Sequence, residues 1–132
     1  MKITPDTNVL VRAITGDDEK QCRAAQAVLD RAEIVALTLP ALCELVWVLM
    51  RGYEAEPGEI AAVINRLVNS ANVVVDRAAA GAGLKMLEAG GDFADGVIAY
   101  EGRWLTGDVF VSFDKQAAKL LRAEGRKVQL LT

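Results

Sequence analysis

The chain has 132 residues, carries a net charge of −3 at neutral pH and contains no histidine. The missing imidazole excludes ribonucleases with a histidine pair, hydrolases with a Ser-His-Asp or Cys-His group, and zinc or iron sites that need histidine. With only 2 cysteines beside 18 Asp and Glu residues, hydrolytic chemistry must rest on carboxylates, hydroxyls, Lys or Arg, or on a metal ion held by oxygen.

The length is that of one domain of ordinary size, and we expect a single domain over residues 1–132. The longest strongly apolar run, Leu45 to Met50, is far shorter than the roughly 20 residues that cross a bilayer. The first residues lack the apolar segment of a signal peptide, so we expect a cytoplasmic protein with free thiols and no membrane contact. The acidic charge balance disfavours nucleic-acid binding unless a bound cation attracts the phosphate.

Short apolar strands alternate with amphipathic helices along the chain, and turn residues such as Pro40, Gly52 and Pro57 separate them. In chain order we predict a strand at Lys2–Pro5, helices at Asn8–Ile14 and Asp17–Ala32, a strand at Glu33–Thr38, helices at Leu42–Arg51 and from Pro57, a strand at Val73–Val75, helices at Arg77–Glu88 and Phe93–Leu105, a buried strand at Val109–Phe113, a helix at Lys115–Glu124 and a strand at Val128–Leu131. This alternation predicts an α/β protein with a mostly parallel sheet, whose ligand crevice lies at the carboxyl ends of the strands.

Carboxylates stand where the predicted strands end or the predicted helices begin. Asp6 follows the first strand, Asp114 follows the strand at Val109–Phe113, and Asp92 and Asp95 open a helix. Each of them alone is compatible with a helix cap. Their joint placement at strand ends and helix starts instead predicts a shared acidic site.

Glu44 lies within an otherwise apolar predicted helix, beside Leu42 and Leu45. An ionised carboxylate in such surroundings is costly unless it is paired, bound to a metal or turned toward a groove. Surface exposure is the alternative interpretation.

Carboxylates that converge repel one another, which raises their pKa values unless a cation neutralises them. Hard oxygen ligands select Mg²⁺ or Mn²⁺, and the acids present permit one or two ions. Such an ion would hold a phosphate oxygen and lower the pKa of its own water, so that a nucleophile forms without histidine.

Four motifs of this chain, in this order, resemble those of PIN-domain nucleases, in particular the VapC-like toxins of bacterial type II toxin–antitoxin pairs. They are the segment Asp6–Arg12, Glu44 within Leu42–Leu49, the segment Asp92–Ala99 and the segment Val111–Asp114. The resemblance extends from Ile3 to about Leu121. It implies a three-layer α/β/α sandwich with a central mostly parallel sheet, and Mg²⁺- or Mn²⁺-dependent endonucleolytic cleavage of RNA.

The resemblance assigns Asp6, Glu44, Asp95 and Asp114 to the positions of the family's four acids. It implies that Asp6, Asp95 and Asp114 bind the metal, directly or through water. Glu44 would orient or deprotonate the attacking water or complete the metal shell, and Asp92 is an additional candidate ligand.

Other residues have supporting positions in the same motifs. Asn8 resembles an asparagine that braces the first acid by hydrogen bonds, and Ser112 keeps the hydroxyl of a more usual threonine. Gly96 stands where alanine is commoner, from which we expect only a slightly weaker helix. Three basic residues are candidates for contact with the RNA backbone, with solvated surface as the alternative for each: Arg12, Arg103 and Lys115.

Two other functions stay open. A small phosphatase of the haloacid-dehalogenase type would use Asp6 as nucleophile, but it needs a second aspartate two residues later, where Asn8 stands. A non-catalytic interaction domain is the other alternative, and the presence of all four acids disfavours it. The resemblance also implies a homodimer that is inhibited by a small antitoxin protein. Apolar helix faces such as that of Trp47 could form the dimer contact or bind the antitoxin. The alternative is that these faces belong to the core.

Overall fold

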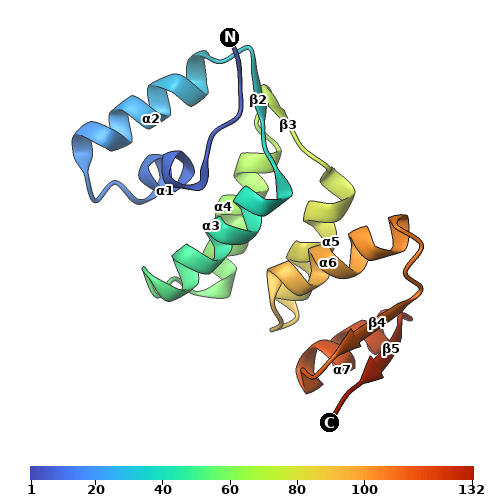
Figure 1. Cartoon of the computed structure of the whole chain (residues 1–132). Coiled ribbons are helices and arrows are strands. Elements are labelled where there is room, and N and C mark those ends of the chain that lie inside the picture. Colours follow the sequence, from blue (N-terminus) through green and yellow to red (C-terminus); the bar gives the residue numbers. More distant parts are fainter. The chain divides into compact units, whose positions relative to one another are not determined.

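One or two helices separate successive short parallel strands in this computed structural model, which describes all residues from 1 to 132 (Figure 1). The chain divides into two units, Met1–Arg77 and Ala78–Thr132, and each is described by itself. No helix in either unit is long and apolar enough to cross a membrane.

The first unit is built on three short parallel strands in the order β1-β2-β3. They are β1 (Lys2–Ile3), β2 (Ile34–Ala36) and β3 (Val73–Val74). Lys2 pairs with Ile34, and Val35 pairs with Val73. The strand β1 ends before the buried Pro5, which has no N–H group to continue a ladder.

Four helices complete the first unit: α1 (Thr7–Thr15), α2 (Glu19–Arg31), α3 (Leu39–Arg51) and α4 (Pro57–Val68). The helix α1 packs against both α2 and α3, and α3 packs against α4. Their apolar stripes supply the core, whose largest fully buried side chains are Leu10, Leu42, Leu45, Ile60 and Ile64.

The second unit contains α5 (Arg77–Glu88), α6 (Phe93–Trp104), β4 (Val109–Ser112), α7 (Lys115–Ala123) and β5 (Lys127–Leu130). The strands β4 and β5 are parallel, in a register that pairs each residue of Val109–Ser112 with one of Lys127–Leu130. The helix α7 packs against both strands. Met86, Ala99, Ala117 and Leu121 form a core cluster in this unit.

The helices α5 and α6 approach each other closely because glycine stands at their contact. A Cβ atom on Gly96 would lie 2.4 Å from the backbone oxygen of Ala82, and one on Gly83 would lie 2.7 Å from the ring of Phe93. Gly96 is thus required by helix packing, and the expectation that it only weakens the helix is wrong.

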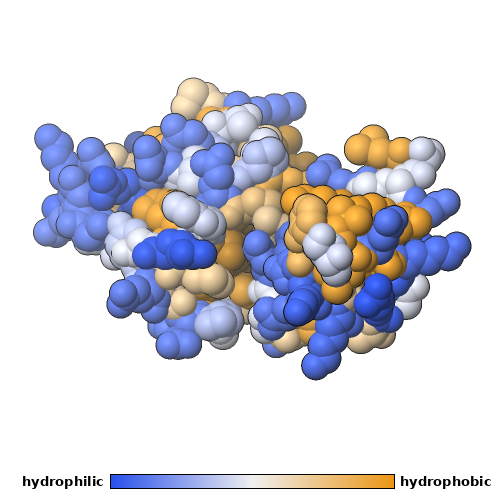
Figure 2. Space-filling model, turned by 60° about the horizontal axis from the view of Figure 1, so that its bottom comes forward, coloured by the Kyte–Doolittle hydropathy of each residue, from blue (hydrophilic) through white to orange (hydrophobic).

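Most sequence predictions of secondary structure hold, with element ends that differ by at most three residues. The expectation of a buried strand at Val109–Phe113 is wrong. Val109, Val111 and Phe113 are 46%, 51% and 71% exposed, because within its unit β4 pairs only with β5 and has α7 packed against it. Figure 2 shows that apolar side chains reach the surface between hydrophilic ones.

Candidate functional site

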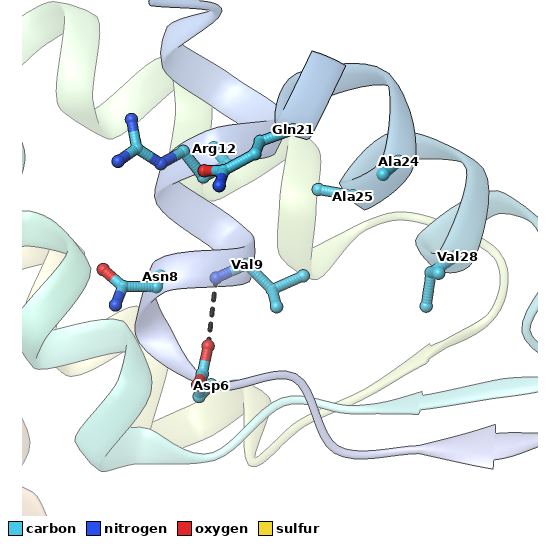
Figure 3. Close-up of a pocket in the computed structure, with 8 residues that line it drawn as sticks. All are labelled: Asp6, Asn8, Val9, Arg12, Gln21, Ala24, Ala25 and Val28. Carbon is cyan, nitrogen blue, oxygen red and sulfur yellow. Dashed lines mark hydrogen bonds between the residues drawn. The ribbon is translucent and has the colours of Figure 1, made fainter. Parts of the chain in front are cut away.

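Asp6 is the N-cap of α1 and lies just beyond the carboxyl end of β1. Its Oδ1 atom accepts a hydrogen bond of 3.0 Å from the backbone N–H of Val9, as Figure 3 shows. A capping carboxylate at this position also faces the positive end of the helix dipole. The sequence interpretation of Asp6 as a cap and its interpretation as a site residue are therefore compatible.

Glu44 lies on the exposed side of α3, close to the start of α1. Its Oε2 atom accepts a hydrogen bond of 3.2 Å from the hydroxyl of Thr7. Asp6, Thr7 and Glu44 line one hollow of about 260 Å³. The first unit thus brings two of the four predicted acids to one place, and exposure resolves the cost of a charge within an apolar helix.

A second hollow, of about 530 Å³, lies between α1 and α2 and begins at Asp6 (Figure 3). Val9 and Val28 contribute its apolar wall, while Asn8 and Arg12 extend from one side of α1. The hydrogen bond that holds Asp6 comes from Val9 rather than from the side chain of Asn8. Asn8 therefore lies beside Asp6 at the rim of this hollow.

In the second unit, Asp92 and Asp114 are also N-caps. Asp92 precedes α6 and accepts a hydrogen bond of 3.0 Å from Ala94 N–H. Asp114 precedes α7 and accepts from Gln116 N–H at 2.9 Å and from Ala117 N–H at 3.1 Å. The hydroxyl of Ser112 accepts a hydrogen bond of 2.9 Å from Asp114 N–H, which fixes the turn that carries the acid.

Asp95 lies in the first turn of α6 and is half-buried. Burial raises the pKa of its carboxyl, and the negative charges of Asp92 and Asp114 raise that pKa further. The second unit therefore gathers three of the predicted acids, and a cation beside Asp95 would relieve both their repulsion and the cost of burial.

The three capping aspartates share one property that suits a ligand role. In Asp6, Asp92 and Asp114 the capping hydrogen bonds use Oδ1 alone, so each Oδ2 keeps its lone pairs for another partner. Carboxylate oxygens are the donors that Mg²⁺ and Mn²⁺ prefer. The residues present therefore fit a hard divalent ion by their chemistry.

Within neither unit do three or more carboxylates converge closely enough to hold a metal ion on their own. Mg²⁺ commonly binds proteins through one or two carboxylates and keeps several waters. An ion bound in either unit would need only that small set of ligands.

The structure adds one residue that the sequence analysis did not single out. Thr7 donates its hydroxyl proton to Glu44 and belongs to the same motif as Asp6 and Asn8. The position of Thr7 next to Asp6 could have marked it as a candidate. Its hydrogen bond to Glu44 was not predictable in this way, because Glu44 is 37 residues away in the sequence. Of the three basic candidates, Arg12 pairs with Asp17 at 3.1 Å, and Lys115 is exposed at the start of α7.

Comparison with protein families gives a class for this fold and these acids. The PIN domain family model matches residues 3–122. The chain therefore belongs to the PIN domain family, whose domains have a nuclease-type fold, act on nucleic acids and generally depend on divalent metal ions. The predicted α/β class with parallel strands is confirmed. Comparison with curated proteins found no match.

Proposed function

We propose that this chain, as one PIN domain over residues 1–132, is a metal-dependent endoribonuclease that hydrolyses phosphodiester bonds of RNA. The observation that carries the proposal is the grouping of the acids. Asp6 and Glu44 share a hollow of the first unit, and in the second unit Asp92 and Asp114 both lie within electrostatic reach of Asp95. In a chain without histidine, carboxylates such as these can hold a metal ion that activates water.

The residues divide into holding and positioning roles. Asp6, Asp95 and Asp114 would hold one or two Mg²⁺ or Mn²⁺ ions, with Asp92 as an additional ligand. When bound, a divalent ion supplies positive charge to the phosphate and lowers the pKa of water. Glu44 would orient the attacking water and take up its proton, and the Thr7 hydroxyl holds that carboxylate in place. Ser112 fixes the turn that carries Asp114, and the backbone N–H of Val9, rather than the side chain of Asn8, holds Asp6.

The motif resemblance supports a finer proposal about biological role. We infer a toxin of the VapC-like kind, acting in the cytoplasm as a homodimer and inhibited by a small antitoxin protein. A toxin whose RNA cleavage stops growth must be held inactive by such a partner in its own cell. Expression of the chain should therefore arrest growth unless the antitoxin is present or Asp6 is replaced.

The first test is RNA cleavage by the purified chain and by its Asp6→Asn variant. The variant should lose activity by about a hundredfold or more, because asparagine can still cap α1 but supplies no negative charge. Cleavage by the unaltered chain should require Mg²⁺ or Mn²⁺ and stop with EDTA. The readout is the rate of appearance of RNA fragments.

Asp18→Asn is the matched control, since Asp18 caps α2 in the same manner, accepting a hydrogen bond of 3.0 Å from Gln21 N–H. This variant should cleave RNA at the rate of the unaltered chain. The nuclease proposal would be wrong if RNA stays intact with both Mg²⁺ and Mn²⁺, or if Asp6→Asn and Asp18→Asn cleave RNA at equal rates. Turnover of a small phosphomonoester with a trapped phosphate on Asp6 would instead support the phosphatase alternative.

A further inference from the structure

The second half of α6 carries cationic and aromatic side chains around two adjacent hollows of the second unit. Lys85, Tyr100, Arg103 and Arg126 are among the residues that line the first hollow, of about 320 Å³. Tyr100, Arg103 and Trp104 line the second, of about 330 Å³. Tyr100 and Arg103 belong to both, so the two hollows form one surface, which we call the α6 basic surface.

The cations of this surface differ in whether they form an ion pair within the chain. Lys85 forms an ion pair with Glu124 at 3.2 Å, whereas Arg103 and Arg126 form none. Arg126 is half-buried, and its guanidinium donates a hydrogen bond of 2.6 Å to the backbone oxygen of Ala99. That bond holds Arg126 against α6 next to Arg103.

The guanidinium groups of Arg103 and Arg126 are close enough for their positive charges to repel each other. Burial lowers the pKa of Arg126, and the charge of Arg103 lowers it further, while the negative charges of Asp108 and Glu124 act in the opposite direction. The first hollow is lined by three cations, Lys85, Arg103 and Arg126, and by one carboxylate, Glu124, so it is net positive in a chain whose total charge is −3. Guanidinium groups bind phosphate by paired, charge-assisted hydrogen bonds, so the chemistry of this hollow suits a phosphate group.

The aromatic part of the surface is open to solvent. Trp104 is 75% exposed and follows Arg103 directly at the end of α6. The chain has only 7 aromatic residues, counted as 2 Trp, 2 Tyr and 3 Phe, and two of them flank this one arginine. Exposed aromatic rings next to cations are the arrangement on which single-stranded nucleic acid stacks its bases.

Tyr100, Arg103 and Trp104 of this surface lie on the same helix as Asp95. Tyr100 and Arg103 follow Asp95 by five and eight residues, which is about 7.5 and 12 Å along the axis at 1.5 Å per residue. A single strand bound at Asp95 would reach the α6 basic surface within a few nucleotides.

We propose that the α6 basic surface binds a single-stranded segment of the RNA substrate beside the cleaved bond. Arg103 and Arg126 hold a backbone phosphate, and a base stacks on Trp104. This inference rests on the proposed ribonuclease function and adds a binding site to it. The binding has no base-specific contact in this arrangement, because stacking and phosphate contacts are tolerant of sequence.

The test is binding of a single-stranded RNA oligonucleotide in EDTA, where cleavage does not occur, followed by tryptophan fluorescence. The Trp47→Phe background leaves Trp104 as the sole tryptophan. RNA should quench its fluorescence. Arg103→Ala should weaken binding about five- to tenfold and reduce the slope of log affinity against log salt by about 0.7, the value for one phosphate contact on a single strand.

Trp104→Ala, followed by fluorescence anisotropy of labelled RNA, should weaken binding about five- to a hundredfold, as expected for loss of one stacked base. Lys119→Ala is the matched control, because Lys119 is an exposed cation of α7 that lines neither hollow. Circular dichroism melting checks that each variant folds, and Arg103→Lys should recover part of the affinity if charge is what matters.

The outcomes separate the two proposals. If the unaltered chain binds and cleaves RNA while Arg103→Ala and Trp104→Ala bind as tightly as Lys119→Ala, the α6 basic surface is not an RNA site, although the nuclease proposal stands. If Trp104→Ala changes the oligomeric state in sedimentation and leaves RNA affinity unchanged, the surface is a protein interface and the inference is wrong. If the unaltered chain neither binds nor cleaves RNA, both proposals fail.

Discussion

Asp95 shows at the scale of one residue how a site can oppose stability. Burial and two neighbouring carboxylates raise the pKa of this carboxyl, so the folded chain disfavours its ionised form. The sign follows from linkage: the cost to the free energy of unfolding is absent below the ordinary aspartate pKa, grows as the pH rises above it, and is complete above the raised pKa of the folded chain. Residues that oppose stability in this way are often kept for function.

We therefore expect Asp95→Asn to raise the melting temperature at pH 7 in EDTA, because the neutral amide removes the repulsion and the burial of a charge. Asp30→Asn, on an exposed position of α2, should leave the melting temperature nearly unchanged. Thermal melts by circular dichroism measure both. A lower melting temperature for Asp95→Asn than for the unaltered chain would contradict this electrostatic interpretation of the acidic group.

The pKa of Asp17 is shifted in the opposite direction, and this residue is not one of the candidate site acids. The Tyr53 hydroxyl donates to it at 2.6 Å and the Thr15 hydroxyl at 3.0 Å, and with Arg12 they lower the pKa of this exposed carboxyl. A lowered pKa gives stability that is complete above the ordinary aspartate pKa of about 3.9 and is lost as the pH falls through the folded value.

Tyr53→Phe should accordingly lower the melting temperature at pH 7, and the difference from the unaltered chain should shrink as the pH is lowered below about 3.9. Tyr100→Phe removes a hydroxyl that makes no such bond to a carboxylate and should show no comparable pH dependence. Melting curves across a pH series decide the matter. If the melting temperature of Tyr53→Phe differs from that of the unaltered chain by the same amount down to acid pH, the hydrogen bond to ionised Asp17 is not the cause of the difference.

At the scale of elements, helix starts were predictable from the sequence because capping is local. Asp6, Asp92 and Asp114 each accept a hydrogen bond from an amide two or three residues ahead, so the signal and the structure it causes lie in the same few residues. The exposed face of β4 was not predictable. An apolar run looks alike whether helices cover one face of a strand or both.

The close contact of α5 and α6 is another feature that local patterns did not reveal. Gly96 appeared as a weak helix former, whereas its role depends on Ala82 and Gly83 of a different helix. Such a requirement arises only when two elements pack, so a single sequence carries no local sign of it.

Gly96→Ala should lower the free energy of unfolding by about 1–3 kcal/mol, since the added methyl would push α6 away from the backbone of α5. Gly102→Ala lies on the same helix with open space around its Cβ position and should be neutral or stabilising by about 0.5–1 kcal/mol. Urea unfolding of both variants provides the comparison. Equal stability for the two would mean that the helices do not approach as closely as described.

At the scale of the whole molecule, the missing histidine and the four acids predicted the chemistry better than the net charge did. An overall charge of −3 disfavours a nucleic-acid partner when taken alone. The PIN family match over residues 3–122 covers acids of both units and assigns the chain to a nuclease-type family. Strand ends and helix starts pointed to candidate acids, whose role stays a prediction, but they did not reveal that Thr7 donates a hydrogen bond to Glu44 or that Arg103 lines two hollows.

Under the proposed function, acids from distant parts of the sequence would serve one reaction. Asp6 belongs to the first unit and Asp95 to the second. Residues that act as one catalytic group show strongly non-additive effects when they are replaced together, whereas independent residues show effects that multiply in rate.

The most direct measurement is single-turnover cleavage of RNA by Asp6→Asn, by Asp95→Asn and by the double variant, all at saturating Mg²⁺ or Mn²⁺. We predict that each single variant loses most of the rate and that the double variant is no slower than the slower single one. Losses that multiply in the double variant, or a single variant that cleaves at the rate of the unaltered chain, would contradict the proposal that the two acids serve one reaction.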